Sequence, residues 1–168
     1  CFPAPILLAL LLNEVRHQRF KKVIQTISYL PHFISWVIIA NIIDRLLNTN
    51  VGLANGIITA LGGKAIHFTG STKWFLPIVV ISNLWKEVGF SSIVYLAAMT
   101  QISPELYEAA EVDGAGRFAQ LKHVTLPGIY PIISMMLVLS IPSLINAGFD
   151  QIYLLHNPLN QPVSEILD

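Results

Sequence analysis

Two long stretches without a formal charge dominate this sequence. The 21 positions of residues 23–43 carry no charged side chain, and neither do the 26 positions of residues 124–149. An α-helix needs about 20 predominantly apolar residues to cross the hydrocarbon core of a bilayer. Hydrophobic residues make up 54% of the chain and charged residues only 12%, against about 25% charged residues in soluble proteins. The sequence therefore predicts an all-α protein, a polytopic bundle of transmembrane helices.

Two further apolar segments add to this prediction. Residues 1–12 are uncharged but too few to cross a bilayer alone, so they predict the last part of a span or a short core helix. Residues 74–100 are long enough, but Lys86 and Glu87 interrupt them. Each charge near a bilayer centre costs about 2.5–3.5 kcal/mol, so a broken helix is predicted there. Because the chain begins at Cys1, inside an apolar run, we expect a fragment truncated at this end.

The loops between these segments differ in their basic residues. Residues 13–22 hold four, and residues 48–73 hold two, Lys64 and Lys73. Lys and Arg are enriched in cytoplasmic loops, so the first loop is predicted to be cytoplasmic and the second external. A short interfacial helix is expected at 57–61 within the second loop. Residues 150–168 contain no Lys or Arg and predict another external loop, with a new helix starting at Ser164 and Glu165.

Some polar residues fall inside the predicted spans. Ser28, His32 and Ser35 have the spacing of one helical face, and Pro31 predicts a kink between them. Asn83, Lys86 and Glu87 form a polar wedge in the third apolar segment. Polar groups in spans normally face the bundle interior. We therefore expect a role in the translocation path or in contacts between subunits, with a purely structural role as the alternative, for His32, Ser35, Asn83, Lys86 and Glu87.

The most polar stretch is residues 103–127. Ser103 can cap a helix, Pro104 fits its first position, and Glu105 favours the positive end of the helix dipole. Gly114 and Gly116 permit a sharp bend. A second short helix is predicted from 117 to 123, and Pro127 is expected to close the unit before the last span. The prediction is a bent helix pair between two hydrophobic segments.

The same stretch resembles the EAA loop of the membrane subunits of ATP-binding-cassette importers. That motif reads Glu-Ala-Ala, three residues, Gly, nine residues, an aliphatic residue, one residue and Leu-Pro. The positions that match, with Val124 as the aliphatic residue, are Glu108, Ala109, Ala110, Gly114, Val124, Leu126 and Pro127; Asp113, directly before the Gly, also fits the common form of the motif. The resemblance implies that 103–127 is a cytoplasmic coupling loop that docks on an ATPase subunit.

Further segments resemble the carbohydrate-uptake branch of the type I importer permeases, related to lipopolysaccharide- or polysaccharide-type transport proteins. They are residues 13–16, 28–36, 85–89 and 153–158. The resemblance implies a single transmembrane permease domain over 1–168, in the inner membrane of a bacterial cell, which imports a sugar or oligosaccharide. Because members of that family usually carry one further span, the domain is expected to be truncated at its C-terminal end as well as at its start. It also implies a second permease subunit, ATPase subunits and an extracytoplasmic solute-binding protein as partners, besides the lipid bilayer.

Other chemistry finds little support in the sequence. The net charge of zero gives no sign of nucleic-acid binding. A single cysteine cannot form a disulfide framework or a zinc cluster within the chain. The chain has no Walker phosphate loop, since Gly63-Lys64 is followed by Ala65. We therefore expect no catalytic residue, no metal and no cofactor, and ATP hydrolysis by a separate partner. A permease for amino acids, peptides or ions remains an alternative, as does a membrane-embedded enzyme or scaffold.

Overall fold

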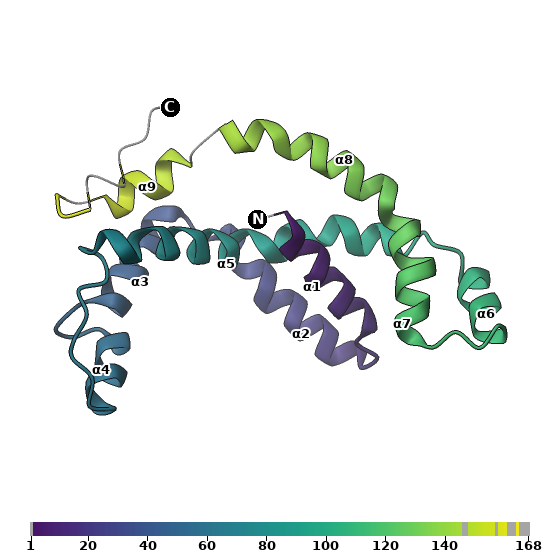
Figure 1. Cartoon of the computed structure of the whole chain (residues 1–168), viewed down its shortest axis with the longest axis horizontal. Helices are drawn as coiled ribbons and strands as arrows, with labels where there is room; N and C mark the ends of the chain where they lie inside the picture. Colours follow the sequence, from purple (N-terminus) through teal and green to yellow (C-terminus); the bar gives the residue numbers. More distant parts are fainter. Residues whose placement is uncertain (1, 146–147, 157, 161–163, 165–168) are drawn as a thin grey trace. The chain divides into compact units, whose positions relative to one another are not determined.

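The computed structural model of the chain describes residues 2–145, 148–156, 158–160 and 164. These residues form helices and turns, with no strand among them (Figure 1). The all-α prediction is therefore confirmed. In chain order the elements are α1 (Pro3–Glu14), α2 (Gln18–Tyr29), η1 (Leu30–Phe33), α3 (Trp36–Leu47), α4 (Leu53–Ala60), α5 (Thr72–Met99), α6 (Pro104–Val112), α7 (Arg117–Gln120), η2 (Leu121–Thr125), α8 (Leu126–Ile145) and α9 (Phe149–Leu155).

The chain divides into two compact units, and the division falls inside α5. The first unit is Cys1–Pro31 with Lys86–Ile145. Its core is apolar and draws on α1, the last turns of α5 and the start of α8. The buried members of this core are Ala9, Leu12, Tyr95, Leu96, Ala98, Met99 and Ile129. This core supports the loop that contains α6.

The second unit is His32–Trp85 with Asn146–Asp168. In it α3 contacts both α4 and α9. Buried polar side chains connect segments that are far apart in sequence. Gln151 of α9, 4% exposed, donates from Nε2 to the backbone oxygen of Val79 at 2.7 Å and to Oγ of Ser82 at 2.9 Å. Hydrogen bonds thus fix α9 against the first half of α5.

The predicted span over residues 23–43 is not one helix. Helix α2 ends at Tyr29, the 3₁₀ turn η1 follows, and α3 starts at Trp36. Ser35 caps α3, since its Oγ accepts a hydrogen bond of 3.4 Å from the backbone N–H of Ile38. Pro31 has no N–H to continue the α-helical ladder, and an N-cap residue has non-helical backbone angles. The expected kink is therefore a full break, and Ser28, His32 and Ser35 do not share the face of one helix.

The third apolar segment differs from its prediction in the opposite sense. A broken helix was expected at Lys86 and Glu87, but α5 runs without interruption for 28 residues. A charged side chain leaves the backbone hydrogen bonds of a helix intact, and Lys86 is only 6% exposed, with a hydrogen-bond acceptor inside the first unit. The cost of the charge is thus reduced by a partner rather than by opening the helix.

Length and composition identify one helix in the described residues as able to cross a membrane, Arg117–Pro142. A second candidate exists if Gln18–Phe33 and Trp36–Leu47 are counted together as one bent span. Helix α5, which contains Lys86 and Glu87, is not among the helices that are long and apolar enough to cross a membrane. The apolar segment 124–149 is thus the clearest of the predicted spans in the structure.

The predicted external loops contain more helix than expected. A helix is observed where a short interfacial one was expected at 57–61: α4 runs from Leu53 to Ala60. Residues 150–155, predicted as loop, lie in α9, which begins at Phe149 after Gly148, whose φ of +73° lies in the left-handed region. Of the helix start predicted at Ser164 and Glu165, Ser164 is helical and Glu165 lies outside the described residues.

Candidate functional site

Helix α6 carries the glutamate and the two alanines of the motif. It begins at Pro104 with Glu105 in its first turn, as predicted. The side chain of Ser103 makes no capping hydrogen bond, so that detail of the prediction is wrong; the backbone oxygen of Ser103 accepts from the N–H of Leu106 at 3.2 Å instead. Glu108 and Ala109 are exposed, and Ala110 is half-buried. The helix therefore presents a small, flat and partly acidic surface.

A Schellman turn ends α6. The N–H of Ala115 donates to the backbone oxygen of Ala110 at 2.8 Å, and the N–H of Gly114 donates to that of Glu111 at 3.0 Å. Gly114 has a φ of +77°, the left-handed conformation that this motif requires. A Cβ on Gly114 would meet nothing within 4 Å. The predicted bend is thus confirmed, and what demands glycine is the backbone angle rather than crowding.

Beyond the bend the chain forms one continuous helical segment. α7 passes directly into the π-helical turn η2 and then into α8, so the short helix predicted from 117 to 123 does not end before the last span. In η2 the N–H of Leu126 bonds to the oxygen of Leu121, five residues earlier. Proline removes one backbone donor and crowds the preceding turn, and a π turn widens the helix at that place. Pro127 is therefore accommodated and does not close the unit.

Three contacts inside the first unit hold this loop in place. Oη of Tyr107 on α6 and Oγ1 of Thr125 in η2 share a hydrogen bond of 3.0 Å, and Thr125 is 2% exposed. Arg117 and Glu14, at the end of α1, form an exposed ion pair at 4.0 Å. Leu126 packs against the apolar core. The first arm of the loop is thus attached to the second, and the second arm is attached to α1 and to the core.

A close approach of two helices lies deeper in the same unit. A Cβ on Gly89 of α5 would collide with the backbone oxygen of Ser28 on α2. One turn away, Nζ of Lys86 donates to the backbone oxygen of Pro31 at 3.3 Å. Glycine allows the backbones to touch, and the lysine satisfies a carbonyl that follows the end of α2. Lys86 and Gly89 together fix α5 to α2.

The predicted polar wedge is divided between the two units. Asn83 lies in the second unit, where its Nδ2 donates to Oε1 of Gln151 at 3.4 Å. Lys86 and Glu87 lie in the first. Gln151 was missed by the sequence reasoning because it stands in a segment predicted as loop. His32 lies in η1 and Ser35 caps α3, so neither belongs to a regular span.

Comparison with known proteins gives a consistent result. A family model described as "Binding-protein-dependent transport system inner membrane component" matches residues 2–167. The polygalacturonan/rhamnogalacturonan transport system permease protein YteP of Bacillus subtilis (strain 168) is 49% identical over 167 residues, 99% of this chain and 52% of that protein. Protein LplB of the same organism is 46% identical over the same shares. The chain spans about half the length of the curated relatives it matches.

A solved structure agrees with these relatives. The bacterial ABC transporter involved in the import of the acidic polysaccharide alginate superposes with a TM-score of 0.95 at 44% identity, over 98% of this chain and 58% of that one. The fold and the sequence comparison therefore lead to the same group of permeases, including its carbohydrate branch. The chain belongs to the family of binding-protein-dependent transport system inner membrane components.

Proposed function

We propose that this chain is part of the permease subunit of an ABC importer that carries a sugar or oligosaccharide across a bacterial cell membrane. The relative YteP is named as a permease of polygalacturonan/rhamnogalacturonan transport, and the transporter of the solved structure is involved in the import of alginate. The permease itself would form the path, and separate ATPase subunits would hydrolyse ATP. A second permease subunit and an extracytoplasmic solute-binding protein complete the proposal, supported by a related complex that contains an alginate pentasaccharide-bound periplasmic protein.

The coupling loop is the observation that carries this proposal. Exposed Ala109 leaves room for another protein's groove to approach closely, and exposed Glu108 offers a charge for pairing. The Schellman turn at Gly114 fixes the angle between the two arms, and the bond between Tyr107 and Thr125 attaches α6 to the segment that continues as α8. A surface that is accessible yet rigidly attached is suited to transmit a movement of the ATPase to the membrane. We place this loop on the cytoplasmic side.

The motif residues have distinct proposed roles. Glu108, Ala109 and Ala110 form the docking face. Asp113 and Gly114 form the turn, and Leu126 and Pro127 join the loop to the long helix. The polar residues of the helical segments are proposed to face the bundle interior, at the path or at the second permease subunit, because lipid exposure would be costly. They are His32, Ser35, Asn83, Lys86 and Glu87.

The decisive test compares two glycines of the loop in the full-length permease, assembled with its partners in liposomes. Gly114→Val places a β-branched residue at positive φ, at a cost of about 1–2 kcal/mol, and should weaken co-purification of the ATPase and abolish substrate-stimulated ATP hydrolysis. Gly116→Val is the matched control, because Gly116 has a φ of −68° and open space around it. Ala109→Trp should act like Gly114→Val by obstructing the docking face.

Normal docking and stimulated hydrolysis in both Gly114→Val and Ala109→Trp would refute the coupling role. Equal loss in the Gly116→Val control would indicate a general sensitivity of the loop rather than a specific turn. The substrate class is tested separately, by uptake of labelled oligosaccharides, amino acids and peptides into the same liposomes.

A further inference from the structure

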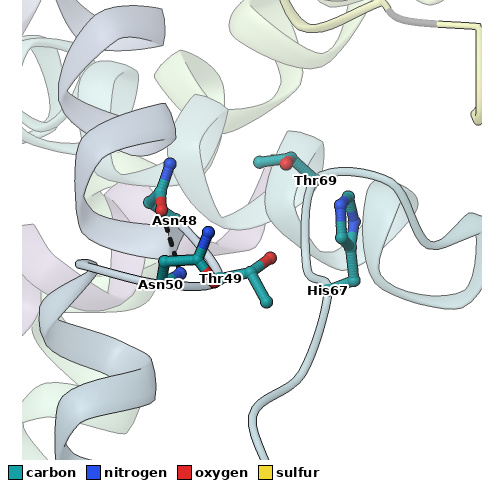
Figure 2. Close-up of a pocket in the computed structure, with 5 residues that line it drawn as sticks. All are labelled: Asn48, Thr49, Asn50, His67 and Thr69. Atoms are coloured by element: carbon teal, nitrogen blue, oxygen red, sulfur yellow. Dashed lines mark hydrogen bonds between the residues drawn. The ribbon is translucent and has the colours of Figure 1, made fainter.

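The second unit contains a polar cavity that the proposed function does not use. Its volume is about 350 Å³, and it is lined by Asn48, Thr49, Asn50, His67 and Thr69. Figure 2 shows these side chains around one open space, from the turn that follows α3 and from the segment that precedes α5. Ligand pockets in proteins commonly measure about 300–1,000 Å³. The cavity is therefore large enough for one small ring.

One buried side chain holds both walls of this cavity. Asn55, 2% exposed, donates from Nδ2 to the backbone oxygen of Asn48 at 3.2 Å and to that of Ile66 at 2.9 Å. Its Oδ1 accepts from the N–H of Ile66 at 2.8 Å. The second wall is held again by Asn160, 0% exposed, whose Nδ2 donates to the backbone oxygen of Thr69 at 3.1 Å. The cavity is thus formed in advance by buried amides, which lowers the cost of ordering it on binding.

The lining offers donors and acceptors without a carboxylate, an amine or a guanidinium. Nδ1 of His67 accepts a hydrogen bond of 3.0 Å from the N–H of Gly70, which leaves the proton of a neutral imidazole on Nε2 as a donor. Oδ1 of Asn48 accepts from the N–H of Asn50 at 3.0 Å, so the amide of Asn48 keeps its Nδ2 donors for a ligand. Within the described part of the chain, the side chains of Thr49 and Asn50 make no hydrogen bond.

We propose that this cavity binds one pyranose unit of an uncharged saccharide. Each sugar hydroxyl both donates and accepts, as a Thr hydroxyl and an Asn amide do between them. An ionised ligand would find no opposite charge among the five lining residues, whereas a ring of hydroxyls can satisfy amide, hydroxyl and imidazole groups together. The inference rests on the proposed carbohydrate transport, and it adds a saccharide site on the loop predicted to be external.

The test uses the complete importer in lipid nanodiscs and methyl β-D-galactopyranoside as the probe. Saturation-transfer NMR measures contact between the protein and the protons of the glycoside. The double variant Thr49→Val/Asn50→Ala removes a hydroxyl and an amide that have no described structural hydrogen bond. Two lost hydrogen bonds should lower binding about tenfold. The control Gln18→Ala removes an exposed amide from the basic loop predicted to be on the opposite face, and should leave the signal unchanged.

Three outcomes of these measurements would overturn the proposed site. An equal signal in the wild type and the double variant overturns the site. Stronger binding of galacturonate than of the neutral glycoside overturns the uncharged class. If the double variant no longer binds the solute-binding protein but keeps the glycoside signal of the wild type, the cavity is a contact for that protein. This result also overturns the proposal. Sugar uptake is measured in parallel in the liposomes used to test the proposed function. Uptake without a site-specific NMR signal refutes only this inference, and a site-specific signal without uptake refutes only the transport function.

Discussion

Tyr107 and Thr125 join the two ends of the loop 103–127, for which we propose the coupling role, through a single hydrogen bond of 3.0 Å between their hydroxyls. Tyr107 is half-buried on α6, and Thr125 is buried in the π turn that leads into α8. Eighteen positions separate the two residues in sequence. The bond therefore makes α6 and the start of the long helix one mechanical piece, instead of two helices joined only by a turn.

Tyr107→Phe should weaken this connection. The variant keeps the ring and leaves the buried hydroxyl of Thr125 without this partner, which costs about 1–3 kcal/mol. We expect a lower melting temperature of the assembled complex and a smaller increase in the rate of ATP hydrolysis when substrate is added. Tyr130→Phe is the matched control, because Tyr130 lies on α8, is exposed and has no described hydrogen bond. The same loss in both variants would show that the hydrogen bond is not the cause.

Gly89→Ala should destabilise the first unit more than any other glycine-to-alanine change in a helix of the described chain. A Cβ there collides with the backbone oxygen of Ser28, and backbone atoms cannot move aside as a side chain does. Overpacking of this kind costs about 1–3 kcal/mol. Gly56→Ala on α4 is the opposite case, because nothing lies within 4 Å of the added atom. It should stabilise by about 0.5–1 kcal/mol.

Thermal denaturation of the two variants in detergent would compare them directly. If Gly89→Ala melts at or above the wild-type temperature, α5 and α2 do not touch as described. Gly56→Ala reports at the same time whether the assay detects a gain in helix stability.

Lys86→Met should reduce the amount of assembled permease. The change leaves the backbone oxygen of Pro31 without the donor at 3.3 Å, while the methionine keeps most of the volume. Lys73→Met is the control, since Lys73 lies on the same helix and is exposed. Immunoblotting of membranes measures assembly, and uptake is then expressed per assembled complex. Normal assembly with lost uptake would mean that Lys86 acts on the transported solute and not as an anchor.

The predicted orientation can be checked with single cysteines in a protein whose Cys1 is replaced by Ser. An impermeant maleimide should label Gly56→Cys in intact cells, and Gln18→Cys only after permeabilisation. Both positions are exposed, so accessibility within the subunit does not limit the reaction. The reverse pattern would place the basic loop outside and the coupling loop away from the ATPase.

Features set by local chemistry could be predicted from the sequence. The start of α6 at Ser103-Pro104 and the bend at Gly114 depend on a proline at the first helical position and on a residue that tolerates positive φ. Both are visible in a few neighbouring residues, and both are observed.

Features set by distant contacts could not be predicted. The charge of Lys86 indicated a broken helix, but its acceptor, the oxygen of Pro31, stands 55 positions away. Gln151 and Asn55 lie in segments predicted as loops, where polar side chains are expected. In the structure Gln151 donates a hydrogen bond to α5, and Asn55 holds both walls of the cavity. Spacing along one helix cannot show such partners, because they depend on which segments pack together.

The π turn at Leu121–Thr125 has a consequence for how the long helix is oriented about its own axis. Each residue of an α-helix advances about 100° around that axis, and a π turn holds one residue more than an α-helical turn would. All side chains from Leu126 onward are therefore rotated by roughly a quarter turn or more from where a regular continuation of α7 would place them. A helical wheel drawn across residues 117–142 without this turn would therefore place the side chains of α8 on the wrong side of the helix. The extra residue of the π turn decides which side chains of α8 face the core of the first unit.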